Sequence, residues 1–298
     1  MYFGSIRFFK HLILFFIFLM IVVPIAIAIS LGIKNASYRK AIYALEHKNN
    51  IAAESDKQIR YISSSESEAI EYQLIYPELY SDYDGQKASV VADKTMYLTF
   101  DDGPSEKTSQ VLDILKEYNI KATFFVVGRT DEKSKNLMRR IVNEGHQIGV
   151  HSYSHVYNKI YSSVSAYLDD FYKMYQLIYE TTGVKPQIFR FPGGSINSYN
   201  SGIYQEIIAE MQRRGFVFYD WNISSGDANS KASEMSIRQS ILTNIEKYSR
   251  GIILMHDAST KSTTVAALPS IIEGLKNKGY NFGVLTPDVK PMIFNYTD

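Results

Sequence analysis

The chain has 298 residues, a formal net charge of +1 and no cysteine. This charge gives no reason to expect a nucleic-acid partner, and the lack of cysteine excludes disulfides, thiolate metal sites and a cysteine nucleophile. Hydrophobic residues make up 45% of the sequence, which is ample for a core.

The first predicted element is a membrane-spanning helix over Leu12–Ile33. This run carries no charge and would be about 33 Å long as a helix, enough to cross a bilayer core. The short tail before it favours a signal anchor at residues 1–34, with the rest of the chain outside the cytoplasm. Cleavage near Ala26-Ile-Ala28 is the alternative, although a cleavable signal has a shorter apolar core.

Residues 35–92 are predicted to form a stalk and linker. The segment from Asn35 to about Ile62 has the pattern of an amphipathic helix, and the serine-rich run at 63–68 has the composition of a solvated linker. The pattern of Glu71 to Ala92 leaves two alternatives open, an added edge strand or a segment that wraps the next domain. We expect the folded domain at 93–290 and a C-terminal tail at 291–298.

Strand and helix patterns alternate through the folded domain. The predicted strands are Met96–Phe100, Ala122–Val127, Gln147–Val150, Ile188–Phe191, Phe216–Ile223, Gly251–Met255 and Asn281–Leu285. The predicted helices are Ser105–Tyr118, Glu132–Asn143, Val164–Thr181, Gly202–Arg213, Glu234–Tyr248 and Val265–Asn277, and glycines that suit helix C-caps follow several of them, at Gly145, Gly183, Gly215 and Gly279. The alternation predicts an α/β fold with a parallel sheet, closed or distorted into a (β/α) barrel of seven or eight units.

Chemically capable side chains lie at or just past the ends of these strands. They are Asp101, Asp102, His151, Arg190, Asp227 and His256. In a barrel the carboxyl ends of the strands meet at one face, which carries the active site. The fold therefore predicts that residues far apart in the sequence form one site.

Asp102, His151 and His155 form a plausible two-histidine, one-carboxylate metal site. Imidazole and carboxylate suit zinc and its neighbours, and three protein ligands leave positions open for water and substrate. Two histidines four residues apart are by themselves more often surface or core residues than ligands. Ser152 stands where a zincin motif needs glutamate, so that class of metalloprotease is excluded.

The remaining candidates each have a chemical and a structural interpretation. Asp101 could take a proton from water, or it could only set the turn before Gly-Pro or cap the next helix. Arg190 could hold the charge of that carboxylate. His256 could donate a proton to a leaving amine, since its pKa can lie near neutrality, or it could be a structural histidine.

The motifs TFDDGP, HSYSH, RFPGGS, DWNISSGDA and LMHD occur in that order. With them, the chain from about Lys94 to Pro287 resembles the polysaccharide deacetylase family, also called carbohydrate esterase family 4 or the NodB-homology domain. The resemblance implies a metal-dependent hydrolase that releases acetate from N-acetylglucosamine units.

The resemblance also implies a role for each matching residue. Asp101 would be the general base, held by Arg190, and His256 the general acid, held by Asp227. The divalent ion, with Zn²⁺ preferred and Co²⁺ or another ion as alternatives, would be bound by Asp102, His151 and His155. The backbone N–H of Gly193 would stabilise the oxyanion, and Leu254 would line the acetyl pocket.

Two positions depart from the family pattern. Ala228 follows Asp227 where many members have tryptophan, so one pocket wall is missing or is supplied by Trp221. Gly193 stands where an aromatic residue often follows the proline; its N–H remains, but the wall does not.

The sequence predicts a membrane-anchored, extracytoplasmic N-deacetylase of a cell-wall polysaccharide, most simply peptidoglycan. The predicted anchor would place the enzyme beside the wall. The alternatives are a deacetylase of chitin or poly-N-acetylglucosamine, an esterase for an O-acetylated glycan, and a catalytically silent glycan-binding protein with the same fold.

Overall fold

The structure is a computed structural model that describes residues 10–11, 71–83, 94–243 and 245–294. The predicted membrane span and the stalk helix therefore lie outside the described residues and stay predictions. In the described ranges, no helix combines the length and apolar character that crossing a membrane requires. Glu71–Asp298 forms one compact unit.

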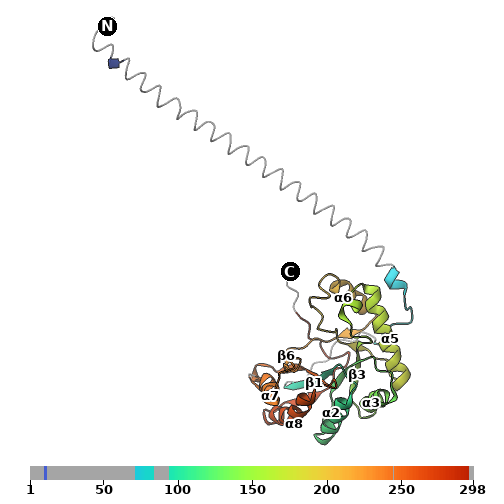
Figure 1. The fold of residues 1–298 in the computed structure, drawn as a ribbon, viewed down its shortest axis with the longest axis vertical. Helices are drawn as coiled ribbons and strands as arrows, with labels where there is room; N and C mark the ends of the chain where they lie inside the picture. Colours follow the sequence, from blue (N-terminus) through green and yellow to red (C-terminus); the bar gives the residue numbers. More distant parts are fainter. Residues whose placement is uncertain (1–9, 12–70, 84–93, 244, 295–298) are drawn as a thin grey trace. The chain divides into compact units, whose positions relative to one another are not determined.

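Eight strands form one parallel sheet in the order β5-β4-β3-β2-β1-β7-β6, and β8 pairs with β1 (Figure 1). The strands are β1 (Thr95–Asp101), β2 (Thr123–Val127), β3 (Gln147–Ser152), β4 (Ile188–Phe189), β5 (Val217–Phe218), β6 (Ile223–Ser224), β7 (Arg250–His256) and β8 (Asn281–Gly283). The described pairings leave β5 and β6 at the two ends of the sheet, so the predicted α/β barrel is confirmed in its distorted, incompletely closed form.

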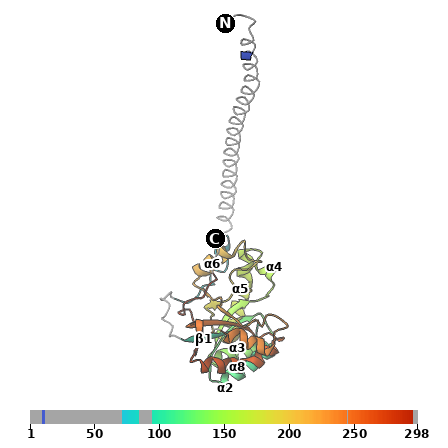
Figure 2. The same ribbon diagram turned by 90° about the vertical axis from the view of Figure 1, so that its left-hand side faces the viewer.

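Helices follow most of the strands and lie along the outer side of the sheet (Figure 2). They are α2 (Glu106–Glu117), α3 (Glu132–Asn143), α4 (Tyr157–Ile160), α5 (Val164–Thr182), α6 (Tyr204–Arg213), α7 (Glu234–Leu242) and α8 (Ser262–Asn277), with a 3-10 turn at Ile245–Lys247. The expected glycine caps are confirmed, since Gly145, Gly183, Gly215 and Gly279 all have φ between +76° and +80°.

The prediction of a single strand over Phe216–Ile223 is wrong. Residues 217–218 pair with β4 and residues 223–224 pair with β7, at opposite ends of the sheet. The backbone between them crosses the barrel, and Asp220 N donates to Met292 O at 2.9 Å. One β-prone run thus contributes to two strands, and its middle is held by the C-terminal residues.

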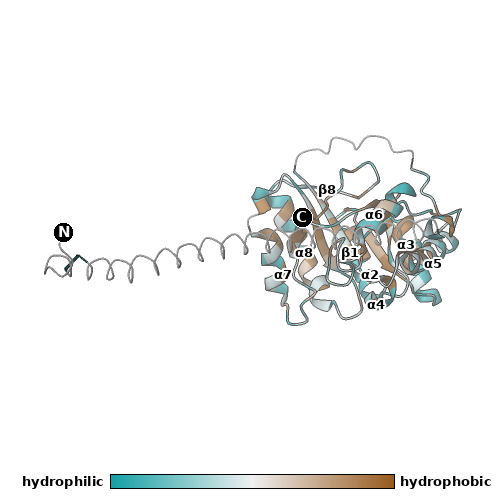
Figure 3. Ribbon diagram, turned by 90° about the horizontal axis from the view of Figure 1, so that it is seen from above, coloured by the Kyte–Doolittle hydropathy of each residue, from teal (hydrophilic) through white to brown (hydrophobic). Residues whose placement is uncertain are grey.

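Two apolar clusters occupy the two faces of the sheet. The smaller fills the barrel interior and contains Tyr97, Phe125, Ile188, Tyr219, Ile252, Leu285 and Val289. The larger lies between the sheet and the helices. Hydrophobic colour accordingly concentrates on the strands and the inward sides of the helices, while hydrophilic colour covers the outward sides (Figure 3).

Residues 71–83 pack onto α6, although the sequence analysis placed them in the stalk and linker. The wholly buried guanidinium of Arg214 donates to the backbone carbonyls of Tyr72, Ile75, Tyr76 and Leu79. Its Nε donates to Glu210 at 2.6 Å, which balances the buried charge. The compact unit therefore begins at Glu71, and of the two alternatives for this segment the wrapping one describes residues 71–83.

Candidate active site

The site lies at the carboxyl end of the barrel strands, on the face that points inward. Side chains alternate along a strand, so Asp101 on β1 continues the inward row of Tyr97, and His256 on β7 continues that of Ile252. Asp101 and His256 are also direct register partners across β1 and β7. The parallel pairing of β1 with β7, together with the alternation of side chains between the two faces of each strand, thus brings the first and last motifs of the domain side by side.

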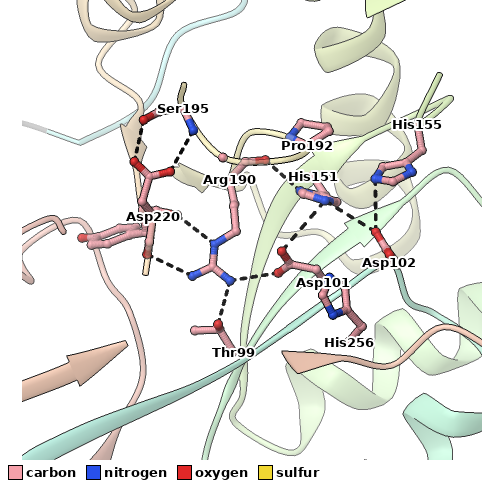
Figure 4. Close-up of polar contacts among 12 residues, drawn as sticks. Thr99, Asp101, Asp102, His151, His155, Arg190, Pro192, Ser195, Asp220 and His256 are labelled. Atoms are coloured by element: carbon pink, nitrogen blue, oxygen red, sulfur yellow. Dashed lines mark hydrogen bonds and ion pairs between the residues drawn. The ribbon is translucent and has the colours of Figure 1, made fainter. Parts of the chain in front are cut away.

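The predicted metal ligands come together (Figure 4). Nε2 of His151 lies 3.5 Å and Nε2 of His155 3.2 Å from Oδ1 of Asp102. One ligand atom from each residue lies within 4.8 Å of the other two. In the described part of the chain, these three predicted ligands form the only group of His, Asp and Glu side chains that could hold one ion.

The donor set fits a divalent cation. Oδ1 of Asp102 is buried and receives no hydrogen bond from the described residues, although it faces both histidines. Nδ1 of His151 lies 2.8 Å from the carbonyl oxygen of Arg190, which can only accept, so Nε2 carries the free lone pair. Asp102 and His155 also have left-handed backbones, with φ of 74° and 56°, a conformation that is maintained at functional sites at some cost.

Asp170 on α5 supports the turn that carries His155, and the sequence analysis did not predict this role. Its carboxylate accepts from Ser152 Oγ at 2.6 Å, from Tyr153 N at 2.7 Å and from Ser154 N at 2.8 Å. Ser152 Oγ in turn accepts from His155 N at 2.8 Å. The carboxylate therefore fixes the turn that carries His155. No motif marks Asp170, since it lies inside an ordinary helical pattern.

Asp101 and Arg190 form a buried ion pair. Nη1 of Arg190 lies 3.0 Å from Oδ1 of Asp101, and the two residues are 0% and 2% exposed. The guanidinium also donates to Thr99 Oγ1 at 2.6 Å and to the carbonyls of Tyr219 and Asp220 at 2.8 and 3.3 Å. Such a network balances the buried charges and fixes the orientation of the carboxylate.

His256 and Asp227 form the second pair. Nδ1 of His256 lies 2.7 Å from Oδ1 of Asp227, whose Oδ2 accepts from His256 N and from Thr264 Oγ1, each at 2.8 Å. Burial alone would lower the pKa of His256, but the hydrogen bond and the charge of Asp227, with Asp101 and Asp102 behind it, outweigh burial and raise that pKa. The histidine is therefore suited to carry a proton near neutral pH.

The three predicted substrate-contacting residues border this region. Gly193 occupies an exposed turn with φ of 77°. Leu254 lies two residues before His256, on the same face of β7. Trp221 packs edge-on against Phe294 at 4.8 Å and lies 5.7 Å from the guanidinium carbon of Arg190.

Asp220 holds the loop that carries Gly193. The carboxylate accepts from Ser195 N at 2.9 Å and Oγ at 2.5 Å, and from Phe294 N at 2.9 Å. Residues 292–294, assigned from sequence to a C-terminal tail, therefore belong to the support of the site. Sequence reasoning missed this because the contact joins residues far apart in the chain.

An open groove of about 270 Å³ begins at Asp102 and runs between the N-terminal ends of α2 and α3. The exposed side chains of Glu106, Arg129 and Lys133 line it. A groove that leaves the ligand cluster open to solvent on this side can accommodate part of an extended chain.

Comparisons with known proteins identify relatives of this chain. The family described as polysaccharide deacetylase matches residues 88–218. A peptidoglycan-N-acetylglucosamine deacetylase of Bacillus cereus is 38% identical over 194 residues, covering 63% of this chain and 68% of that protein. A bifunctional xylanase/deacetylase of Pseudobutyrivibrio xylanivorans is also 38% identical, over 200 residues that cover 63% of this chain and 29% of that protein.

A solved structure is similar over the same region. The catalytic domain of peptidoglycan N-acetylglucosamine deacetylase from Eubacterium rectale ATCC 33656 matches with a TM-score of 0.67 and 36% identity, covering 72% of this chain and 99% of that one. The barrel and these relatives thus define a hydrolase of the deacetylase class. The chain belongs to the polysaccharide deacetylase family.

Proposed function

We propose that this protein removes N-acetyl groups from N-acetylglucosamine units of cell-wall peptidoglycan, with one divalent metal ion as cofactor. The observation that carries the proposal is that base, acid and ligand side chains all lie in one site. The similarity to peptidoglycan deacetylases of Bacillus cereus and Eubacterium rectale supports this substrate. The N and O ligands favour Zn²⁺, with Co²⁺ as an alternative.

The side chains divide the reaction between them. Bound by Asp102, His151 and His155, the ion would supply Lewis acidity to the acetamide carbonyl and to water. Asp101, oriented by Arg190, accepts a proton from the attacking water. The N–H of Gly193 donates to the carbonyl oxygen as that atom gains negative charge.

His256 completes the hydrolysis. In its protonated form, supported by Asp227, it gives a proton to the sugar nitrogen as the carbon–nitrogen bond breaks. Acetate and a free amine result. The catalytically silent alternative requires the loss of a base, ligand or acid, and the site retains all three.

We further propose that the catalytic unit acts outside the cytoplasm, anchored by Leu12–Ile33. An anchor there would keep the enzyme close to a substrate that is too large to diffuse. Protease treatment of intact cells tests this location: a tag at residue 298 should be removed, whereas a tag before residue 10 should be protected.

The experiment for the reaction measures acetate release by the full-length chain in detergent. Purified peptidoglycan, N-acetylglucosamine oligomers and acetylated xylan are compared, because the xylanase/deacetylase shares the same 38% identity. Chelation should abolish release and Zn²⁺ or Co²⁺ should restore it, except in Asp101→Asn. Faster release from oligomers or xylan than from peptidoglycan would overturn the wall substrate, and no release from any glycan would overturn the deacetylase.

A further inference from the structure

Tyr157, the first residue of α4, occupies the space beside Gly193. A Cβ added to Gly193 would lie 2.9 Å from Cε1 and 3.3 Å from the hydroxyl of Tyr157. The aromatic wall that Gly193 lacks is thus supplied from a different element. The ring of Tyr157 also packs edge-on against the ring of His155, with centroids 5.3 Å apart, so this wall stands directly beside a metal ligand.

Tyr199 extends the wall away from the metal site. The centroid of its ring lies 5.0 Å from that of Tyr157. Tyr199 is 54% exposed, so its ring is accessible from solvent. The loop that carries it is fixed by Asn197, whose Oδ1 accepts from Tyr199 N at 2.9 Å and whose Nδ2 donates to the carbonyls of Pro192 and Gly194 at 3.1 Å. A rigid loop therefore presents a large aromatic side chain to solvent.

We propose that Tyr157 and Tyr199, whose rings are tilted by 57°, form a sugar-binding platform in which the pyranose ring next to the unit being deacetylated stacks with its apolar face on the exposed ring of Tyr199. This inference rests on the proposed function, because it takes the substrate to be a chain of N-acetylated sugars. The platform defines a second sugar site beside the one at the metal. It also favours chains over isolated sugars.

The chemistry of the platform suits an uncharged sugar. Tyrosine combines an apolar ring with a polar tip, which matches the C–H face and the hydroxyl rim of a pyranose. The phenol hydroxyl of Tyr157 is both a donor and an acceptor, so it can form a hydrogen bond with a sugar oxygen. Among the described residues this hydroxyl has no hydrogen-bond partner that would compete.

The test measures binding without turnover. An N-acetylglucosamine tetramer is titrated by calorimetry into full-length Asp101→Asn loaded with Zn²⁺, with and without Tyr199→Ala. Removing the exposed ring should weaken binding roughly tenfold, whereas Tyr199→Trp should retain it. Tyr179→Ala is the matched control, because Tyr179 is 43% exposed on α5 and should leave affinity within about twofold.

Kinetics in the active background separate this proposal from the proposed function. Tyr199→Ala should raise KM for the tetramer, leave KM for free N-acetylglucosamine, which has no neighbouring ring, nearly unchanged, and leave kcat for the tetramer within about threefold. Equal tetramer affinity with and without Tyr199 would overturn the platform even if acetate is released. Tyr199-dependent binding in a chain that releases no acetate would support the platform and overturn the deacetylase.

Discussion

The guanidinium of Arg190 contacts the carboxylate of Asp101 at 3.0 Å, while the carbonyl of the same Arg190 accepts from Nδ1 of His151 at 2.8 Å. One residue thus positions the proposed base with its side chain and a proposed metal ligand with its backbone. The two contacts can be separated by mutation, because a substitution at Arg190 removes only the first.

We expect Arg190→Lys to reduce kcat/KM by about 100-fold or more while metal binding persists. The planar guanidinium contacts Asp101, Thr99 and two backbone carbonyls at once, and the single ammonium of a lysine cannot make all four contacts. Acetate release and bound-metal analysis on the same preparation check this. Loss of the metal together with activity would show that the side chain supports the whole site rather than the base.

The pH profile should respond to Asp227. Its carboxylate helps to raise the pKa of His256, and a general acid works only while protonated, so activity falls as pH rises through that pKa. Asp227→Asn removes the charge, lowers the pKa of His256 and should move the alkaline limb of kcat to lower pH. The maximal rate should also fall, by about 10- to 100-fold.

A matched substitution removes a hydrogen bond to Asp227 without removing its charge. Thr264→Val takes away one donor to Oδ2, so the alkaline limb should stay nearly in place. An unchanged limb in Asp227→Asn would assign the proton transfer to a group other than His256.

Metal affinity should depend on Asp170, which touches no proposed ligand side chain. Asp170 accepts three hydrogen bonds in the turn between His151 and His155, and an amide would turn an N–H₂ group toward one of those donors. We expect Asp170→Asn to weaken metal binding by about 10- to 100-fold in competition with a chelator. Asp169→Asn is the control, since the exposed Asp169 accepts from Tyr76 instead; an equal loss there would contradict the specific role of Asp170.

Local patterns were sufficient to predict that the candidate metal ligands and acid–base residues lie together in one site, while the roles given to them stay predictions. Each follows a β-prone run, and parallel strands end at one face, so knowledge of the fold class alone places Asp101, Arg190 and His256 together. The β-prone run at Phe216–Ile223 was less informative, because Tyr219 and Asp220, which lie between its two short strands, are as fully buried as strand residues. The sequence could not reveal that its middle pairs with the C-terminal residues.

Supporting contacts were the part that sequence could not supply. Tyr157 occupies the space beside Gly193 although it lies 36 residues earlier in the chain. No local sequence pattern indicates this contact. Asp170 and Asp220 act through space in the same way. Hydrogen bonds to backbone N–H groups leave no trace in spacing or composition, so they emerge only from the folded geometry.

Stability should depend on pH through Asp257, whose carboxylate lies against Gly103, the residue after Asp102. Asp257 is 1% exposed, its Oδ2 accepts from Thr108, and its Oδ1 receives no hydrogen bond from the described residues. Burial, with the charges of Asp102 and Asp101, raises the pKa of Asp257 to about 7. A carboxyl with a higher pKa in the folded than in the unfolded chain lowers stability as pH rises between those two values.

Asp257→Asn keeps the shape and removes the charge, so it should raise the free energy of unfolding at pH 8 relative to the wild type. The gain should be on the order of 1–4 kcal/mol and should shrink toward pH 4, where the wild-type carboxyl is protonated in the folded chain. Urea unfolding of the chelated protein at both pH values measures it. Asp113→Asn, on the exposed side of α2, should show no such trend. A gain for Asp257→Asn that is equal at both pH values would assign the effect to packing, because a neutral carboxyl at pH 4 leaves no charge to remove.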